Sequence, residues 1–224
     1  MGKVTEVELK VKVSKDEFLD FMNTNKYFIY NKMCVKEDTY FKKESVNDGS
    51  FIRLRSEKLF DVHVSDGLDF NSVIWEYLLS DDIRDVALCK THDMYVTLKT
   101  KHVDEHGIET NEEQEGKLSC SNPDGFISAY TAANKDYKWF SKTKRAMKFI
   151  VDLDSEKLSQ NLNLEFVHVK GIDGVFAEIE YVNPTGIAEE DLPKIVDWLK
   201  TIILEIGFND EKIEPRSWKE MLGI

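Results

Sequence analysis

Apolar and charged residues alternate strictly over residues 6–13, close to the start of the chain. Successive side chains of an extended strand point to opposite faces of a sheet. The segment therefore predicts a strand with one apolar face and one charged face. The apolar face consists of Val7, Leu9, Val11 and Val13. The charged face consists of Glu6, Glu8, Lys10 and Lys12.

The same period of two recurs along the chain and predicts further strands. They are expected at 38–41, 51–55, 95–101, 108–118, 138–153, 162–169 and 175–182. Several of their charged faces carry a single sign. Arg53 and Arg55 share one face, Lys99 and Lys101 share another, and 178–180 repeats the Glu-x-Glu of the first strand.

Helical spacing of apolar residues predicts helices beside the strands. Ser14 followed by Glu17 has the sequence of a capping box, which predicts a helix start. A second helix is expected over 123–134. A third covers 192–206, where Gly207 follows as the expected C-terminal cap.

Residues 56–92 show the least regular pattern and are interpreted as an insertion within one domain. Residues 71–79 inside it fit either a short helix or a buried strand, and periodicity does not separate the two.

Short turns between the strands and the lack of a linker predict one domain over residues 1–224. The fold class expected is α+β, with an eight-stranded antiparallel sheet closed into a barrel and helices packed outside. Helices that cover the apolar outer faces turn the charged faces into the barrel. For any single strand, the alternative is a charged face in contact with solvent.

Composition narrows the class of protein. The chain has 224 residues, of which 42% are hydrophobic, and carries a net charge of −12. The acidic balance disfavours nucleic acid as a partner, so cations that bind a polyanion must be concentrated inside a site. With no apolar signal region and three cysteines without a close pair, we expect a cytoplasmic protein with no membrane partner. Monomer and homodimer both stay open.

Charges enclosed in a barrel need partners or a ligand. Clustered Arg and Lys side chains suit phosphate groups. Clustered carboxylates repel each other unless a hard divalent cation such as Mg²⁺ or Mn²⁺ lies between them. Basic walls together with a carboxylate-bound metal indicate a site for a triphosphate.

Several segments occur in an order that resembles the CYTH superfamily, the triphosphate tunnel metalloenzymes. Residues 6–10 match its ExExK signature, 52–55 resemble its paired-arginine strand, and 176–180 resemble its closing F-x-E-I-E. Weaker similarities lie at 38–41, 96–99, 143–145 and 217–222. The resemblance therefore runs nearly end to end.

The resemblance implies a tunnel that takes a small-molecule triphosphate with Mg²⁺ or Mn²⁺. The implied metal ligands are Glu6, Glu8, Glu178 and Glu180. The implied catalytic residues are Glu6, Glu8 and Lys10. The implied triphosphate-binding cations are Lys10, Arg53, Arg55, Lys99 and Arg145, with Lys101 and Lys144 as further candidates. Glu113 and Glu115 correspond to an acidic strand that the family often has.

One strand departs from the family pattern. Members usually carry an Asp on the strand before the closing Glu-x-Glu, where this chain has Val167 or His168. Glu165 or Asp152 are the substitutes that the sequence offers. The departure leaves a second metal site open.

Three functions remain. The favoured one is hydrolysis of a nucleoside, thiamine or inorganic triphosphate by water. The alternative is a class IV adenylyl cyclase, in which the ribose 3′-hydroxyl attacks the α-phosphate of ATP. A non-catalytic phosphate binder is disfavoured, because it would gain nothing from two intact Glu-x-Glu pairs. Trp75, Trp139 and Tyr130 are candidates to stack on a substrate ring, although we favour packing roles for them.

Overall fold

The computed structural model describes residues 4–42, 50–62, 67–80, 87–103, 109–152 and 158–224. The strands are β1 (Val4–Val13), β2 (Phe28–Phe41), β3 (Ser50–Val62), β4 (Ala87–Val103), β5 (Glu109–Leu118), β6 (Lys138–Val151), β7 (Leu162–Val169) and β8 (Val175–Asn183). The α-helices are α1 (Lys15–Thr24), α2 (Phe70–Leu79), α3 (Pro123–Ala133), α4 (Leu192–Glu205) and α5 (Trp218–Met221).

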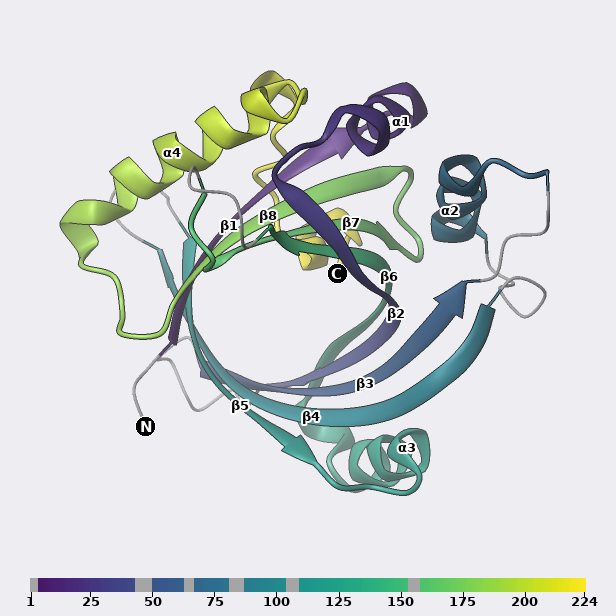
Figure 1. Ribbon diagram of the computed structural model, residues 1–224. Helices are drawn as coiled ribbons and strands as arrows, with labels where there is room; N and C mark the ends of the chain where they lie inside the picture. The colour runs from purple at the N-terminus through teal and green to yellow at the C-terminus, as the bar shows by residue number, and fades with distance from the viewer. Residues whose placement is uncertain (1–3, 43–49, 63–66, 81–86, 104–108, 153–157) are drawn as a thin grey trace.

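The strands form a closed barrel in the order β1-β5-β4-β3-β2-β6-β7-β8, and β8 pairs back with β1. Every neighbouring pair is antiparallel. Figure 1 looks into the resulting ring. Closure gives each strand a hydrogen-bonded neighbour on both sides. The predicted eight-stranded antiparallel barrel of an α+β protein is confirmed.

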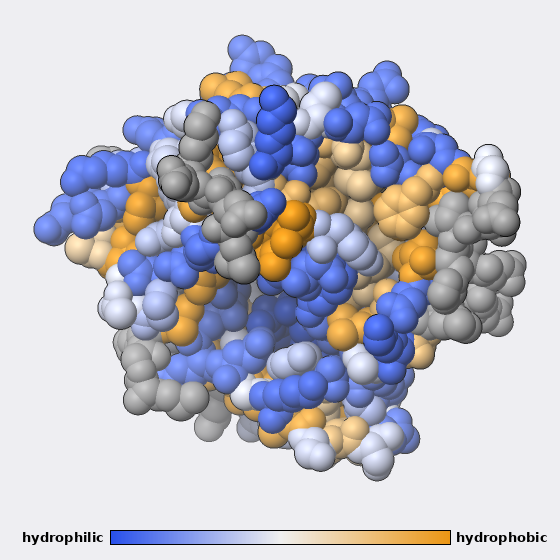
Figure 2. All heavy atoms as spheres, viewed as in Figure 1, coloured by the Kyte–Doolittle hydropathy of each residue, from blue (hydrophilic) through white to orange (hydrophobic). Residues whose placement is uncertain are grey.

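Helices cover the outer wall of the barrel, as Figure 1 shows. Phe18 of α1 and Leu199 of α4 are fully buried in one apolar cluster with Val7 and Phe166 from the strands. The rings of Phe18 and Phe166 meet edge to face at 4.9 Å between centroids. Burial of one such side chain contributes about 1.5–3 kcal/mol. Because the apolar residues face outward, the alternating charged residues face the lumen, and Figure 2 shows a hydrophilic hollow at the centre of the ring.

The helix ends follow the local sequence signals. In the capping box of α1, the Ser14 hydroxyl accepts from the Glu17 N–H, and the Glu17 carboxylate accepts from the Ser14 N–H at 2.8 Å. After α4, Gly207 has a φ of +90°, a left-handed conformation that glycine adopts without strain. None of the helices within the described residues has the length and hydropathy of a membrane-spanning segment.

Three strands are longer than the sequence indicates. β2 begins at Phe28, ten residues before the predicted strand. A register shift between Tyr30 and Lys32 breaks the alternation of apolar and polar residues, so the sequence does not reveal this part of the strand. β3 and β4 take up both ends of the 56–92 segment, and α2 resolves residues 71–79 as a helix. Whether this segment is an insertion stays a prediction. Residues 108 and 153, the expected ends of two strands, lie outside the described residues.

Candidate functional site in the barrel lumen

The two Glu-x-Glu segments lie side by side, because β1 and β8 are antiparallel neighbours. Glu8 is directly opposite Glu180, and Lys10 is directly opposite Glu178. Opposite residues of an antiparallel pair point to the same face, with Cβ atoms about 4.5–5.5 Å apart. The structure therefore brings the four predicted metal ligands, including Glu6, onto one stretch of the lumen wall.

In three of these carboxyl groups the surroundings disfavour the charged form and raise the pKa. Burial raises the pKa of Glu6 to about 9, and the nearby carboxylate of Glu180 adds to the shift. Enclosure within the barrel, followed by Glu178, raises the pKa of Glu8 to about 7, although the Glu8 side chain remains open to solvent in the lumen. Burial and then Glu165 raise the pKa of Glu180. This wall of the lumen has too few cations for its carboxylates.

Glu178 differs from the other three, because the protein satisfies both of its carboxylate oxygens. Glu178 is 4% exposed. Lys144 Nζ pairs with its Oε2, and Trp218 Nε1 donates to its Oε1 at 2.7 Å. Burial by itself raises the pKa of Glu178, but Lys144 outweighs burial and holds this pKa below its ordinary value.

The wall from β3 to β5 consists of ion pairs. Arg53 Nη2 donates to Glu115 Oε2 at 2.9 Å and to Glu113 Oε2 at 3.2 Å. Lys99 pairs with Glu113 as well, and its Nζ lies 3.7 Å from Glu6 Oε2 on β1. The expected acidic residues Glu113 and Glu115 are thus in the lumen, where they hold two of the expected phosphate-binding cations.

Arg55 is held by the carboxylate of Asp38, for which the sequence predicted no role. Its Nε donates to Asp38 Oδ1 at 2.7 Å and its Nη2 to Asp38 Oδ2 at 3.0 Å. Asp38 is 1% exposed, and Tyr40 Oη donates to its Oδ2 at 3.2 Å. Burial raises the pKa of Asp38, but Arg55 outweighs it and holds this pKa well below its usual range. The forked pair fixes the orientation of the Arg55 guanidinium.

On β6, the structure places Lys144 in the lumen and its neighbour Arg145 on the outside. Lys144 pairs with Glu178 and lies 3.1 Å from Glu165. Arg145 shares the opposite face with Met147, which is buried in the cluster beneath the outer helices. The expectation that Arg145 lines the lumen is corrected, because strand alternation admits only one of two consecutive cations.

Two further lysines lie in the lumen, although the motifs did not assign them to the site. Lys36 Nζ pairs with Glu165 at 2.6 Å. Burial and then Lys144 lower the pKa of Lys142 to about 7, against the opposing effect of Asp38 3.9 Å away. Alternation was the available signal, since Lys142 shares a face with Lys144 and Lys36 shares one with Asp38.

The strand that lacks the expected Asp supplies Glu165 to the lumen instead. Glu165 is directly opposite Glu178 of β8. His168 faces outward, where its Nδ1 lies 2.9 Å from the Gly174 carbonyl oxygen. Asp152 follows the end of β6. Of the two expected substitutes, Glu165 is therefore the one in the lumen.

The remaining expected cations, Lys10 and Lys101, lie near the C-terminal helix. Lys10 Nζ is 5.5 Å from the centroid of the Trp218 ring. Lys101 alternates with Lys99 on the lumen face of β4, and both Lys101 and Lys10 act electrostatically on Glu220 of α5.

The donor chemistry of the lumen fits a hard divalent cation, since all four candidate ligands are carboxylates. A cation would also neutralise the crowded charge of Glu6, Glu8 and Glu180. Among the described residues, no group of three His, Cys, Asp or Glu side chains is already arranged to hold a metal ion. Binding therefore requires these side chains to turn toward the ion.

The candidate stacking residues occupy different surroundings. Trp75 packs against Phe18 in the core at 5.3 Å between centroids. Tyr130 of α3 packs edge to face on Phe41 at 5.0 Å, outside the barrel. Trp139 lies beneath the ammonium group of Lys219, 4.4 Å from its ring centroid. Trp75 and Tyr130 thus have the packing roles that we favoured.

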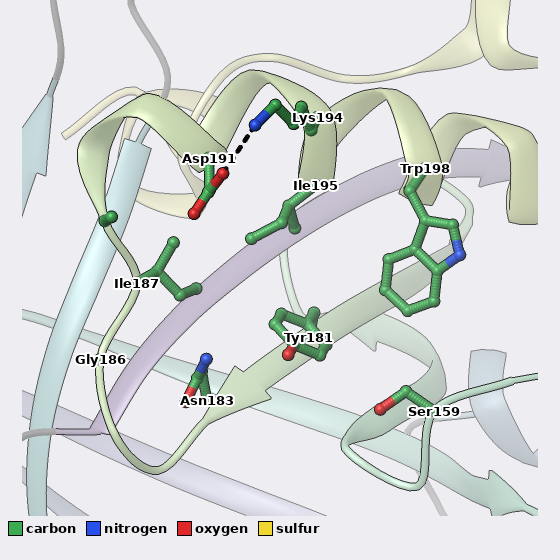
Figure 3. Close-up of a pocket in the computed structure, with 10 residues that line it drawn as sticks. Ser159, Tyr181, Asn183, Gly186, Ile187, Asp191, Lys194, Ile195 and Trp198 are labelled. Carbon is green, nitrogen blue, oxygen red and sulfur yellow. Dashed lines mark hydrogen bonds and ion pairs between the residues drawn. The ribbon is translucent and has the colours of Figure 1, made fainter.

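A groove of about 500 Å³ lies outside the barrel, between α4 and the end of β8 (Figure 3). The rings of Tyr181 and Trp198 meet edge to face across it at 5.5 Å between centroids. Its two charged side chains, Asp191 and Lys194, pair with each other at 2.8 Å. The lumen, with its convergent cations and carboxylates, is the better candidate for a phosphate site.

No protein-family model matches the sequence, and no curated protein is similar to it in sequence. Solved structures share its fold. The PH1819 protein of Pyrococcus horikoshii OT3 is 19% identical, with 97% of each chain covered and a TM-score of 0.62. A proposed adenylate cyclase of Vibrio parahaemolyticus is 14% identical over 100% of each chain, with a TM-score of 0.57.

A third structure is a proposed adenylyl cyclase of Hippeastrum, HpAC1, described as having a dominant triphosphatase activity. It is 13% identical, covers 99% of this chain and 95% of its own, and has a TM-score of 0.52. At these identities the likeness shows the fold. The closed antiparallel barrel is therefore a fold that this chain shares with these structures over nearly its whole length, while membership of the CYTH superfamily stays a prediction.

Proposed function

We propose that the chain binds a small-molecule triphosphate in the barrel lumen and hydrolyses it with Mg²⁺ or Mn²⁺. One observation carries the proposal: facing carboxylates on β1 and β8 share a lumen with buried cations from β3 and β6 and a half-buried lysine from β4. The carboxylates suit a metal ion and the cations suit phosphate groups. A protein that only binds phosphate would need the cations alone.

The cations are already positioned for such a ligand. Arg53, Lys99 and Lys144 are each held by a lumen carboxylate in a fixed place. A triphosphate would replace some of these carboxylate contacts with charge-assisted hydrogen bonds to its own oxygens. Because the side chains are ordered beforehand, binding costs little conformational entropy.

Carboxylates of the β1–β8 wall supply the second part of the proposal. Glu6, Glu8 and Glu180 would hold the metal ion, which in such sites polarises a phosphoryl oxygen and lowers the pKa of water. A carboxylate beside the ion would accept a hydrogen bond from the attacking water and orient it toward the phosphorus atom. Hydrolysis would then need no covalent intermediate with the protein.

Cyclisation of ATP is the second candidate, since the lumen chemistry would be shared. The description of the Vibrio parahaemolyticus neighbour as a proposed adenylate cyclase supports it. The dominant triphosphatase activity ascribed to the Hippeastrum protein supports hydrolysis. The two reactions differ in the nucleophile, which is water in one and the ribose 3′-hydroxyl in the other.

Product analysis tests the proposal directly. The purified chain is incubated with ATP, thiamine triphosphate or inorganic triphosphate, with Mg²⁺ or Mn²⁺ and with a chelator as control, and the products are separated by chromatography. We expect metal-dependent release of orthophosphate. Formation of cyclic AMP and pyrophosphate would contradict the proposed hydrolysis and identify the chain as a cyclase. Tight triphosphate binding without any product would contradict both reactions and identify the chain as a non-catalytic phosphate binder.

A further inference from the structure

Glu178 is engaged within the protein in a way that the other Glu-x-Glu carboxylates are not. Both of its oxygens have a short contact, one with Lys144 and one with Trp218. Glu180 receives only a long hydrogen bond from Asn163, at 3.4 Å. Among the described residues, no hydrogen bond or ion pair to the Glu8 carboxylate is formed. The four predicted ligands are therefore not equivalent.

Trp218 joins this carboxylate to the C-terminal helix, 40 residues further along the chain. Trp218 is 7% exposed, and its ring meets that of Phe176 edge to face at 5.2 Å between centroids. Lys10 and Lys142 lie 5.5 and 6.0 Å from the same ring. α5 thus docks on the barrel through Trp218, which is inserted among residues of β1, β6 and β8, and Met221 packs against the same apolar cluster.

The indole N–H of Trp218 can only donate a hydrogen bond. A buried donor without an acceptor costs free energy, and so does a buried ammonium without its counter-ion. If a metal ion took over Glu178, the Trp218 N–H would lose its acceptor, and Lys144 would keep Glu165, 3.1 Å away, as its ion-pair partner. Glu8 and Glu180 can bind a cation without that loss, and Glu6 would give up a hydrogen bond with Glu113 and the longer approach of Lys99 Nζ at 3.7 Å.

We infer that Glu178 is a positioning residue and not a metal ligand in this chain. One of its oxygens fixes Lys144 in the lumen, the other fastens α5 to the barrel through Trp218, and the metal ion is left to Glu6, Glu8 and Glu180. The metal part rests on the proposed function. The fastening of α5 stands without it.

Nuclear magnetic resonance of the indole N–H groups tests the fastening. The chain has four tryptophans, and Trp218→Phe identifies the resonance of Trp218 by its loss. We expect Glu178→Gln to move this resonance upfield and to leave the other three in place. Amide exchange of Met221 at the end of α5, and of Leu222 directly after it, should become about tenfold faster in both variants. Trp198→Phe, in the outer groove, is the matched control and should leave α5 exchange unchanged.

Unchanged α5 exchange in Glu178→Gln and in Trp218→Phe would overturn the fastening. If Glu178→Gln fails to fold, Trp218→Phe still decides the question, because it keeps every lumen carboxylate.

Calorimetric titration with Mn²⁺ tests the ligand assignment. Glu178→Gln should keep a Kd within about threefold of the parent, whereas Glu8→Gln and Glu180→Gln should weaken binding by at least about tenfold. Weakening by Glu178→Gln as large as that by Glu180→Gln would make Glu178 a ligand. A parent chain that binds no Mn²⁺ would sink the proposed function together with the ligand assignment, while the exchange of α5 would still decide the fastening.

Discussion

The two walls of the lumen treat charge in opposite ways. On β2 to β5, each of Arg53 and Arg55 is matched by carboxylates at hydrogen-bonding distance. On β1 and β8, Glu8 and Glu180 are direct neighbours, and their pKa values are raised. On the first wall the chain itself supplies the counter-ions of its cations, and under the proposed function a triphosphate would replace some of them. On the second wall the carboxylates lack such counter-ions, and under the proposed function a metal ion would supply the missing positive charge.

The comparison predicts that charge removal has opposite consequences on the two walls. Glu8→Gln should reduce metal-dependent triphosphate turnover by at least about 100-fold, because it removes a ligand. It should not lower the stability of the fold, because it relieves repulsion between carboxylates. Phosphate release and thermal unfolding measure the two effects. Glu37→Gln, outside the lumen, is the control. Turnover within tenfold of the parent would contradict the role of the wall.

On the matched wall, Asp38→Asn should lower the free energy of unfolding by about 3–5 kcal/mol, because it leaves a buried guanidinium without its counter-ion. Urea unfolding followed by tryptophan fluorescence measures this change. Asp173→Asn removes an ion pair at the exposed surface and should leave the unfolding midpoint unchanged. An equal midpoint for Asp38→Asn and the parent would show that the pair contributes no stability.

Asp38 also predicts how the stability of the fold responds to acid. The pKa of Asp38 is lower in the folded chain than in the unfolded chain, so its contribution to stability is fully present above about pH 4. That contribution is lost as the pH falls toward the pKa of the folded state. Unfolding curves measured from pH 5 downward should therefore decline less steeply for Asp38→Asn than for the parent. Parallel curves would be inconsistent with a depressed pKa.

The smallest expected effect is on triphosphate affinity, and it should distinguish Lys144 from its neighbour Arg145. Lys144→Gln should weaken the binding of inorganic triphosphate by about tenfold, as expected for one charge-assisted contact. Arg145→Gln should change this affinity by less than about threefold, because its side chain lies outside the lumen. Titration calorimetry measures both. A larger effect of Arg145→Gln would place that residue in the site after all.

Much of the site is visible in the sequence wherever a strand alternates without interruption. Glu6, Glu8 and Glu180 lie where the period of two puts them. The same rule also separates Lys144 from Arg145, since Lys144 shares the face of Lys142 and Arg145 shares the apolar face of Met147. The prediction for Arg145 rested on the family motif instead.

Other parts of the site have no signal in the sequence. The register shift between Tyr30 and Lys32 interrupts the alternation of β2 and so hides where this strand begins. The hydrogen bond from Trp218 to Glu178 joins residues 40 positions apart, and no local pattern predicts such a contact. Local periodicity thus finds the walls of the lumen, while pairing across the barrel decides which charges meet.

The short pairing between β1 and β5 has a consequence for how the barrel opens. Within the described residues, β1 pairs with β5 over 4–6 but with β8 over 5–13. The strand pair with the fewest backbone pairings should separate first. We therefore expect heat or force to separate β1 from β5 and to open the barrel there, while β1 stays paired with β8. The approach of Lys99 to Glu6 crosses this joint. Lys99 and Glu6, which line the candidate site, therefore also help to hold β1 against the β4–β5 side of the barrel.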